Sequence, residues 1–355
     1  MMGLLVFAVV GTLAWWITGR LAREASFLRS LDHPNERSLH SAPTPRSGGI
    51  ALLVSILIGL GLAAIGYALV PQSKGFLPKG FASASLWIVG SIALVTVVSF
   101  LDDRGGLPVW VRFGAQAAAA AIVVWGVGLR VSSVPIPGVG PVALGWFAAP
   151  VSVLFLVWMT NLYNFMDGMD GFAGGMTAIG FGFLAFFGWR SGHPFMLLIT
   201  SLVAASAAGF LIHNFPPARI FMGDVGSIPL GFTAGALMLL GVRDRLFDIW
   251  VPLLIFSPFI LDATVTVVRR AWRGARIWEG HREHYYQRLV LSGWSHRRSV
   301  LVEYGLMLWC GGLAIVYRGA TDRWRMVILF VWMAVFAGLA LAVHRRESRA
   351  DLGSR

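Results

Sequence analysis

The sequence predicts an all-α fold, a polytopic membrane bundle of about eleven transmembrane helices, and three observations support this class. Of its 355 residues, 57% are hydrophobic and only 13% are charged. A soluble domain would carry about twice as much charge. The mean hydropathy is +0.71, and apolar runs of spanning length recur with short polar connections. A soluble globular protein is therefore excluded.

The expected spans follow from the apolar runs in chain order. They are residues 2–19, 48–70, 84–101, 109–128, 146–165, 171–189, 194–212, 226–241, 247–268, 299–317 and 324–343. The first run lacks the basic segment and cleavage site of a signal peptide, so we interpret it as a span. The run at 226–241 is weak and could be tilted or re-entrant. Without a repeat or linker, we expect one membrane-embedded domain at 1–344 and a basic tail at 345–355.

The basic residues predict the orientation. Twenty of the 29 lysines and arginines follow odd-numbered spans or lie in the C-terminal tail, and nine lie on the other side. The positive-inside rule therefore places the N-terminus outside and the C-terminus in the cytoplasm. The net charge of +12 lies in these loops, so we expect membrane lipids and no nucleic acid as partners. The single cysteine, Cys310, excludes a disulfide framework and a cysteine metal site.

Five polar stretches carry the candidate chemistry, and all fall on the predicted cytoplasmic side. They are residues 32–49, 102–107, 161–171, 213–227 and 279–290. Polarity distributed at random among loops would place them on both sides. One composite site facing the cytoplasm is the simplest interpretation.

The stretch 161–171 is the centre of this predicted site. Asn161, Asn164 and Asp167 are spaced by three residues and can share one helix face, and Asp170 continues the spacing. Oxygen ligands at the polar end of an apolar helix suit Mg²⁺ with a phosphate attached. The alternative is a helix cap, but a cap needs only one such residue.

The first loop offers positive charge for a phosphate through Arg37, His40 and Arg46. Paired glycines then open the second span, where free backbone N–H groups can bind an anion. The alternative is a basic loop that contacts anionic lipid.

Two further stretches contribute carboxylates. Asp102 and Asp103 end the third span, and adjacent helical residues point about 100° apart, which favours different tasks over chelation of one ion. One could orient a substrate and the other accept a proton, although acids also mark helix ends. Asp224, in a Gly-Asp-x-Gly-Ser motif after Asn214, offers a carboxylate to a metal beside N–H groups for phosphate.

The remaining candidates lie near the C-terminal third. Asp262 falls within the run 247–268, where an ionisable residue either serves function or pairs structurally with a basic group. In the last stretch, His281 and His284 could bind zinc, but no third ligand appears at a familiar spacing. Contacts of these histidines, Arg282 and Arg288 to a diphosphate fit better.

From Asp32 to Arg288, these stretches in this order resemble the polyprenyl-phosphate N-acetylhexosamine-1-phosphate transferases, the family of MraY and WecA. The resemblance implies an enzyme of the bacterial inner membrane with a cytoplasmic Mg²⁺ site, Mn²⁺ being an alternative ion. Such enzymes transfer a sugar-1-phosphate from a UDP-N-acetylhexosamine to undecaprenyl phosphate and release UMP. A homodimer is compatible with the resemblance.

The resemblance also implies residue roles. Asn164 and Asp224 would hold Mg²⁺, whereas Asp102 and Asp103 would act near the lipid phosphate, with Asp167 as a further catalytic carboxylate. The implied substrate-binding residues are Arg37, His40, Arg46, Asn161, Asn214 and Arg288, with Asp170 and Phe221 at the nucleobase and His281, Arg282 and His284 at the sugar diphosphate.

Two departures from the family pattern leave the sugar open. Arg37-Ser38 stands where many relatives have Arg-Lys, and the last motif ends in Tyr-Tyr-Gln-Arg, as in the WbpL-like, O-antigen-initiating subgroup. N-acetylfucosamine, N-acetylquinovosamine, GlcNAc and MurNAc-pentapeptide donors remain. An ion-coupled transporter is the alternative from another class, but it would place its ionisable residues within broken spans rather than at one face.

Overall fold

The computed structural model describes residues 2–23, 31–34, 39, 42–69, 81–276 and 281–353, and these residues are almost entirely helical. The helices are α1 (Met2–Arg23), α2 (Gly48–Leu69), α3 (Phe81–Gly105), α4 (Val109–Ala121), η2 (Ile122–Val127), η3 (Gly145–Phe147), α5 (Ala148–Phe165), α6 (Phe172–Arg190), α7 (Pro194–Asn214), α8 (Asp224–Arg243), α9 (Trp250–Ile255), α10 (Ser257–Trp272), α11 (Tyr285–Leu291), α12 (His296–Gly319) and α13 (Asp322–Gly353). Two short antiparallel pairs complete them: β1 (Leu31–Asp32) with β2 (Thr44–Pro45), and β3 (Ser133–Ile136) with β4 (Gly140–Ala143).

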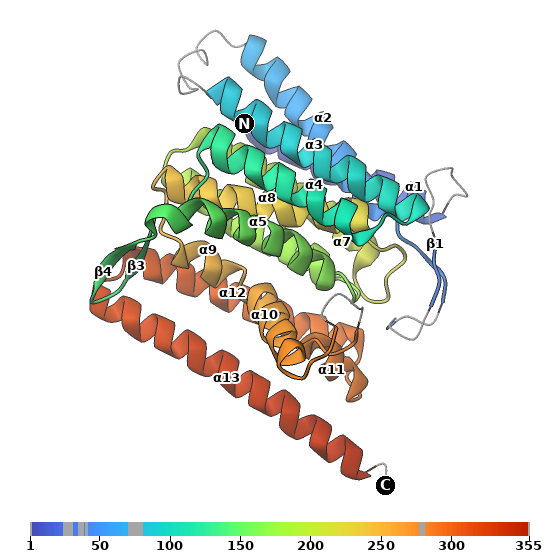
Figure 1. Ribbon diagram of the computed structural model, residues 1–355. Coiled ribbons are helices and arrows are strands. Elements are labelled where there is room, and N and C mark those ends of the chain that lie inside the picture. Colours follow the sequence, from blue (N-terminus) through green and yellow to red (C-terminus); the bar gives the residue numbers. More distant parts are fainter. Residues whose placement is uncertain are drawn as a thin grey trace.

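Within the described residues, ten helices are long and apolar enough to cross a membrane. They coincide with every predicted run except 247–268, so the predicted all-α membrane bundle is confirmed. The helices run side by side, and the two termini of the described chain lie at opposite ends of the bundle (Figure 1). The chain is an integral membrane protein.

The predicted span at 247–268 consists of two helices, α9 and α10, which meet at Phe256. Pro258 explains the break, because proline has no N–H with which to continue the helical ladder. The carbonyl of Leu254, four residues earlier, instead accepts a hydrogen bond of 2.7 Å from the Ser257 hydroxyl. The backbone therefore turns without leaving this carbonyl unsatisfied within the bundle.

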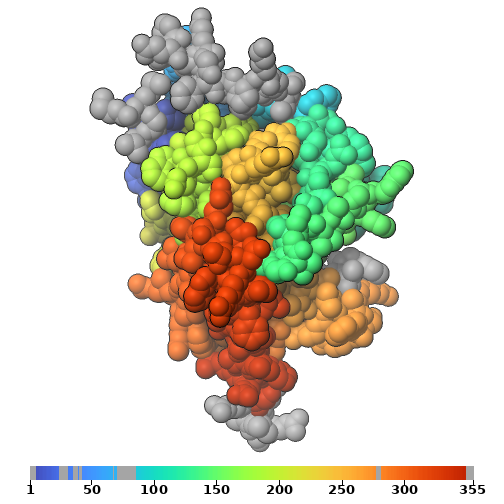
Figure 2. All heavy atoms as spheres, turned by 90° about the vertical axis from the view of Figure 1, so that its left-hand side faces the viewer, coloured from blue at the N-terminus to red at the C-terminus, as the bar shows by residue number. Residues whose placement is uncertain are grey.

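Helix α8 is the centre of the bundle, although its run was the weak one in the sequence. Seventeen of its 20 residues are buried. It packs against α2, α3, α5 and α6. The gold atoms in the middle of Figure 2 are the C-terminal end of α8, with other elements on both sides. Gly49 of α2 and Gly226 of α8 let two backbones meet, because a Cβ on Gly49 would lie 2.4 Å from the Gly226 Cα.

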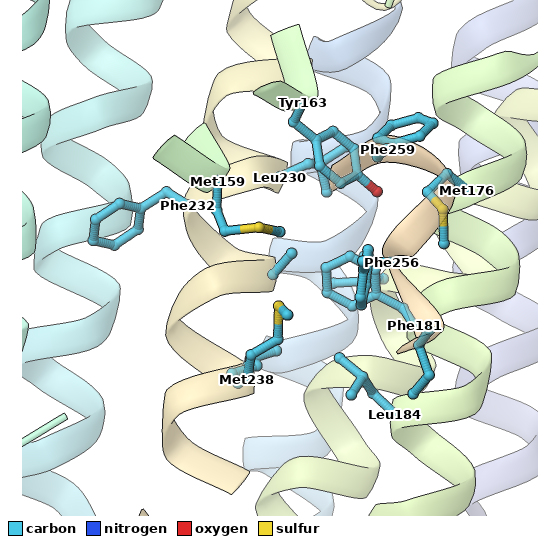
Figure 3. Close-up of a cluster of buried hydrophobic side chains, with 14 of the residues drawn as sticks. Met159, Tyr163, Met176, Phe181, Leu184, Leu230, Phe232, Met238, Phe256 and Phe259 are labelled. Atoms are coloured by element: carbon cyan, nitrogen blue, oxygen red, sulfur yellow. The ribbon is translucent and has the colours of Figure 1, made fainter. Parts of the chain in front are cut away.

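The core beside α8 is aromatic and sulfur-rich (Figure 3). Phe256, at the junction of α9 and α10, packs edge-on against Phe181 of α6 with ring centroids 6.0 Å apart. Phe259 of α10 packs against Tyr163 of α5, and the Tyr163 hydroxyl lies 2.8 Å from the Thr177 hydroxyl. The broken span is therefore anchored in the core, which fixes where α10 leaves the bundle.

A polar network closes the C-terminal end of α8. Asp244 accepts hydrogen bonds from the Arg243 guanidinium, the shorter at 2.7 Å, and lies 3.2 Å from Nε2 of His193. Arg243 also donates to the carbonyl of Val127 at 2.9 Å. Although burial alone would raise it, the hydrogen bonds from His193 and Arg243 lower the pKa of Asp244 to about 2.

This depressed pKa predicts an acid-sensitive contribution to stability. The Asp244 pKa is 3.8 when unperturbed and about 2 in the fold, so its contribution is full above the unfolded value and is lost as the pH falls toward the folded one. We expect Asp244→Asn to lower the free energy of unfolding at pH 7 by about 1 kcal/mol after solvent screening. The difference should shrink to roughly half near pH 3. Thermal unfolding in detergent at both pH values measures it, with Asp322→Asn as the exposed-acid control.

Candidate active site

The structure brings the polar stretches together at the N-terminal end of α8. The first loop joins the fourth stretch through backbone hydrogen bonds: the Phe221 N–H donates to the Pro45 carbonyl at 2.7 Å, and the Gly48 N–H donates to the Phe221 carbonyl at 2.9 Å. Arg46 reaches from this loop to the second stretch, where its guanidinium donates to the Asp103 carbonyl at 2.9 Å. Arg37 and His40 lie outside the described residues, so their role in binding a phosphate stays a prediction.

Asn164 and Asp224, the predicted metal ligands, are in direct contact. The Asn164 amide donates to Asp224 Oδ1 at 2.8 Å and to the Ser227 hydroxyl at 3.1 Å. Asn164 stands at the end of α5, and Asp224 is the first residue of α8, so the helix ends bring together residues 60 positions apart. The positive end of the α8 dipole favours a carboxylate at this position.

Asp103 and Asp167 complete an acidic cluster with Asp224 around this helix end. Val225 donates its backbone N–H to Asp103 Oδ2 at 2.9 Å, and Gly223 donates its N–H to the Asp167 carboxylate. Burial raises the pKa of Asp167 well above its usual value, and the nearby charges of Asp224 and Asp103 raise it further. These three residues are called the acidic cluster below.

The acidic cluster needs positive charge, because three carboxylates repel one another. Asp103 Oδ1 is buried without a hydrogen-bond partner among the described residues, and the Arg46 guanidinium is 3.6 Å from it. Among the described residues, no group of three or more His, Cys, Asp or Glu side chains is placed to hold a metal ion by itself. Mg²⁺ is usually held by one or two carboxylates together with substrate phosphates and water, so the side chains present fit that ion.

Asp102, next to Asp103 on the same helix, has different hydrogen-bond partners. It accepts a hydrogen bond of 2.9 Å from Arg112 of α4 and one of 2.6 Å from the Leu107 N–H. Both carboxylate oxygens are therefore engaged in the turn between α3 and α4. Asp103 is the acid of this pair that faces α8.

Asn161 and Asn214 tie helices together. The Asn161 amide donates to Gln116 of α4 at 2.6 Å and to its own helix, one turn from the Asn164–Asp224 contact. Asn214 accepts from the Gly171 N–H at 3.0 Å and donates to the carbonyl of Ile220 at 2.9 Å. It thereby joins the third polar stretch to the fourth.

Asp170, a predicted nucleobase residue, is held between two elements. Its carboxylate accepts from the Ala218 N–H at 3.0 Å and lies 3.2 Å from Nδ1 of His296, the first residue of α12. The Phe221 ring is partly exposed at the same end of the bundle. His296 lies outside every stretch selected from the sequence.

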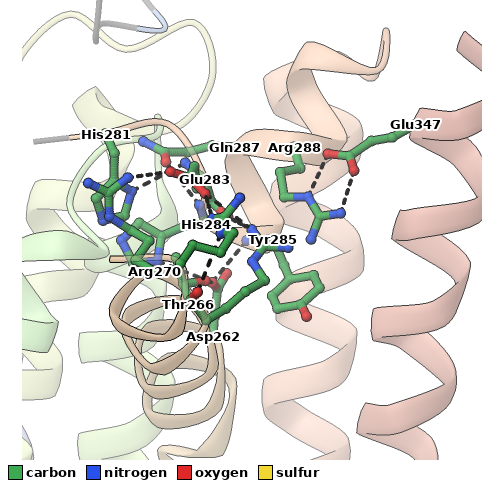
Figure 4. A network of polar contacts seen from close by, with 12 residues as sticks. Asp262, Thr266, Arg270, His281, Glu283, His284, Tyr285, Gln287, Arg288 and Glu347 are labelled. Carbon is green, nitrogen blue, oxygen red and sulfur yellow. Dashed lines mark hydrogen bonds and ion pairs between the residues drawn. The ribbon is translucent and has the colours of Figure 1, made fainter. Parts of the chain in front are cut away.

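Asp262 caps α11, which supports the structural alternative for this residue (Figure 4). Its two oxygens accept the N–H groups of Tyr285 at 2.9 Å and Tyr286 at 3.1 Å, and Oδ1 lies 3.2 Å from Nδ1 of His284. The first N–H groups of a helix have no partner within it, so this carboxylate satisfies two of them. The buried His284 is thereby fixed as well.

We expect Asp262→Ala to loosen α11. The buried N–H of Tyr286 and the partly buried N–H of Tyr285 would lose their acceptor, at a cost of about 1 to 3 kcal/mol in the free energy of unfolding. Thermal unfolding in detergent measures the loss. Thr266→Val is the matched control, because Thr266 donates only a long bond of 3.3 Å to the same carboxylate and its removal should cost little. Equal effects of the two variants would contradict the capping role.

His281 and Arg282 are partly exposed beside this cap. Burial, together with the positive charges of His284 and Arg270, lowers the pKa of His281 to about 4. His281 is therefore neutral at pH 7 and acts as a hydrogen-bonding group rather than a cation. The rings of His281 and His284 lie 4.8 Å apart.

Helix α11 is also joined to the stretch that carries Asp167. The Tyr286 hydroxyl donates to the carbonyl of Phe165, the last residue of α5, at 3.1 Å. At the other end of α11, Arg288 forms a two-pronged ion pair with Glu347 of α13. Glu347, His296, Gln116 and Arg112 are contact residues that lie outside the five polar stretches. Only a His-x-x-Gln pattern at His284 hinted at a helix start there.

The sequence model of glycosyl transferase family 4 matches residues 85–242, from α3 to α8. A probable undecaprenyl-phosphate N-acetylglucosaminyl 1-phosphate transferase of Bacillus subtilis (strain 168) is 33% identical over 318 residues, which cover 89% of this chain and 85% of the relative. A decaprenyl-phosphate N-acetylglucosaminephosphotransferase of Mycobacterium leprae is 33% identical over 335 residues, covering 87% of this chain and 81% of the relative.

A third relative carries a different name. A phospho-N-acetylmuramoyl-pentapeptide-transferase of a Synechococcus species is 30% identical over 318 residues, which cover 84% of each chain. The matched range of the family model contains the stretches 102–107, 161–171 and 213–227. The chain belongs to the MraY/WecA family of polyprenyl-phosphate hexosamine-1-phosphate transferases.

Proposed function

We propose that this protein transfers an N-acetylhexosamine-1-phosphate from a UDP-sugar to undecaprenyl phosphate and releases UMP. The observation that carries the proposal is the acidic cluster with Asn164 at one end of the bundle, in a chain of this family. We place this end at the cytoplasmic face of the bacterial inner membrane, since most of the basic residues lie there. The reaction would begin the synthesis of O-antigen or another cell-envelope polysaccharide.

The donor is proposed to carry an N-acetyl sugar. Two relatives are named for N-acetylglucosamine and one for N-acetylmuramoyl-pentapeptide, which makes UDP-GlcNAc the first donor to test. The Tyr-Tyr-Gln-Arg ending of the last motif favours adding UDP-N-acetylfucosamine and UDP-N-acetylquinovosamine to the panel.

We assign roles in this reaction to four side chains of the site. Asn164 and Asp224 would hold Mg²⁺, which would neutralise charge on the donor diphosphate. Arg46 would draw an anionic phosphate to the helix end. His281, neutral at pH 7, would donate a hydrogen bond to the sugar diphosphate.

The acceptor needs little help to lose a proton. A phosphate monoester has a second pKa of about 6, so the lipid phosphate is largely dianionic at neutral pH. One of its oxygens forms a bond to the sugar-bearing phosphorus, and the bond from that phosphorus to the bridging oxygen breaks, so that UMP leaves. Asp103, anchored by Val225, would position the acceptor rather than act as a strong base.

The test is UMP release by the purified protein with Mg²⁺, undecaprenyl phosphate and each UDP-N-acetyl sugar in turn. We expect release with one sugar only when the lipid is present. Omission of the divalent ion should abolish it, and Mn²⁺ should restore part of it. No lipid-dependent UMP release from folded protein across the whole panel would reject the proposal.

A further inference from the structure

The C-terminal helix reaches the candidate active site. Its apolar run ends at residue 343, yet α13 continues as a helix to Gly353. This continuation packs against α11 and the turn that follows it, and Glu347 lies on the opposite side of Arg288 from Asp262 (Figure 4). Residues of the predicted basic tail therefore lie against an element of the site.

Two adjacent residues of α13 make these contacts. Glu347 accepts a hydrogen bond of 2.5 Å from Nε of Arg288 and a second from its Nη2, which is the two-pronged geometry of strong Arg–carboxylate pairs. The Arg288 side chain is only 7% exposed. Arg346 donates to the Ser292 hydroxyl at 3.1 Å and lies over the Trp294 ring, 5.6 Å from its centroid.

Helix α11 depends on such anchors. It has seven residues, and an isolated helix of that length is unstable in water. Asp262 holds its first turn, the Tyr286 hydroxyl binds the end of α5, and Glu347 holds its last turn through Arg288. A continuous series of contacts thus joins α13 to the segment that carries Asp167.

We infer that Glu347 is a positioning residue for the transfer reaction: through Arg288 it fixes α11, and with it the His281–His284 loop, in register with the acidic cluster. The expected effect on catalysis rests on the proposed function, whereas the contact between Glu347 and Arg288 does not. Because the loop is assigned to the sugar diphosphate, loss of the ion pair should act on the nucleotide sugar rather than on the lipid.

The test compares the full-length wild-type protein with Glu347→Gln, which keeps the shape and removes the charge. We expect KM for the UDP-sugar to rise about tenfold, or roughly 1.4 kcal/mol of binding free energy. KM for undecaprenyl phosphate should change by less than about twofold, because the lipid is not assigned to the His281–His284 loop. Glu347→Asp, which keeps the charge, should restore part of the loss. Partial unfolding would instead lower kcat without raising KM.

Hydrogen exchange supplies a readout that needs no turnover. Amides of residues 285–291 should exchange faster in Glu347→Gln, whereas those of α8 should not. Asp322→Asn is the matched control, because Asp322 forms an ion pair with Arg325 in the first turn of the same helix, 3.5 Å apart, far from α11. This control should match wild type in both assays.

The outcomes separate the inference from the proposed function. Unchanged exchange in Glu347→Gln would overturn the contact, and faster exchange with an unchanged KM would overturn the positioning role. Wild-type protein that releases no UMP would reject the proposed function, and with it the catalytic part of the inference, while the exchange experiment would still decide whether Glu347 holds α11.

Discussion

Replacing Asp224 by asparagine is expected to abolish lipid-dependent UMP release. The substitution removes a negative charge at the head of α8 and keeps the size of the side chain and its contact with Asn164. Loss of one preorganised charge-bearing group in an active site costs on the order of 10² to 10³ in kcat. We expect at least that loss, together with weaker Mg²⁺ binding, measured by UMP release over a Mg²⁺ titration.

The matched control is Asp248→Asn. Asp248 is also a carboxylate beside a helix start, since it accepts the N–H of Trp250, the first residue of α9, at 3.0 Å, but it lies beyond the far end of α8. Its substitution should leave UMP release within about twofold of wild type, as for residues outside the site. Undiminished Mg²⁺ affinity in Asp224→Asn would show that the ion is held elsewhere.

Replacing Gly223 by alanine is expected to have the largest effect on the fold of the site. Gly223 has φ +73°, and a Cβ there would lie 2.2 Å from the Arg46 carbonyl oxygen. With ψ at 172°, this is a backbone conformation adopted almost only by glycine, so it costs an L residue about 1 to 3 kcal/mol, and the forced movement adds about 1 to 3 kcal/mol. The movement would displace both Arg46 and the N–H that binds Asp167, so UMP release should fall along with the unfolding temperature.

Gly192→Ala is the control that has a positive φ without a close contact. Gly192 has φ +63° in the turn between α6 and α7, with no other atom within 4 Å of an added Cβ. It should therefore show only the backbone cost of about 1 to 2 kcal/mol and keep full activity. If the two variants unfold at the same temperature, the close contact between Gly223 and the Arg46 carbonyl does not contribute to the loss of stability.

The sequence was sufficient for the spans because a bilayer requires long apolar runs with internally satisfied backbones. It did not reveal that α8 is the central helix. The run at 226–241 is the shortest of the eleven, and neither its length nor its hydropathy indicates which helix the others enclose. The break at Phe256 was readable in principle from Pro258, but a proline also occurs in unbroken spans, as Pro229 does in α8.

For the site, topology and motif order brought the right segments together. Asn164 and Asp224 meet because each ends a span at the same end of the bundle. The roles of Asp262 and Arg288 were not accessible in this way. The N–H group of Tyr285 that Asp262 binds is 23 residues away in the sequence, and Glu347 is 59 residues from Arg288. Only the folded chain brings these groups within hydrogen-bonding distance.

The enclosure of α8 bears on how the chain is assembled during synthesis. The four helices that pack most extensively against it, α2, α3, α5 and α6, all precede it in the sequence. When the ribosome reaches α8, these main partners have already been made, so this helix can exchange lipid for protein contacts soon after insertion. Helices α9 to α13 are added around a preformed centre, and a nascent chain acquires its acidic cluster well before its last helix.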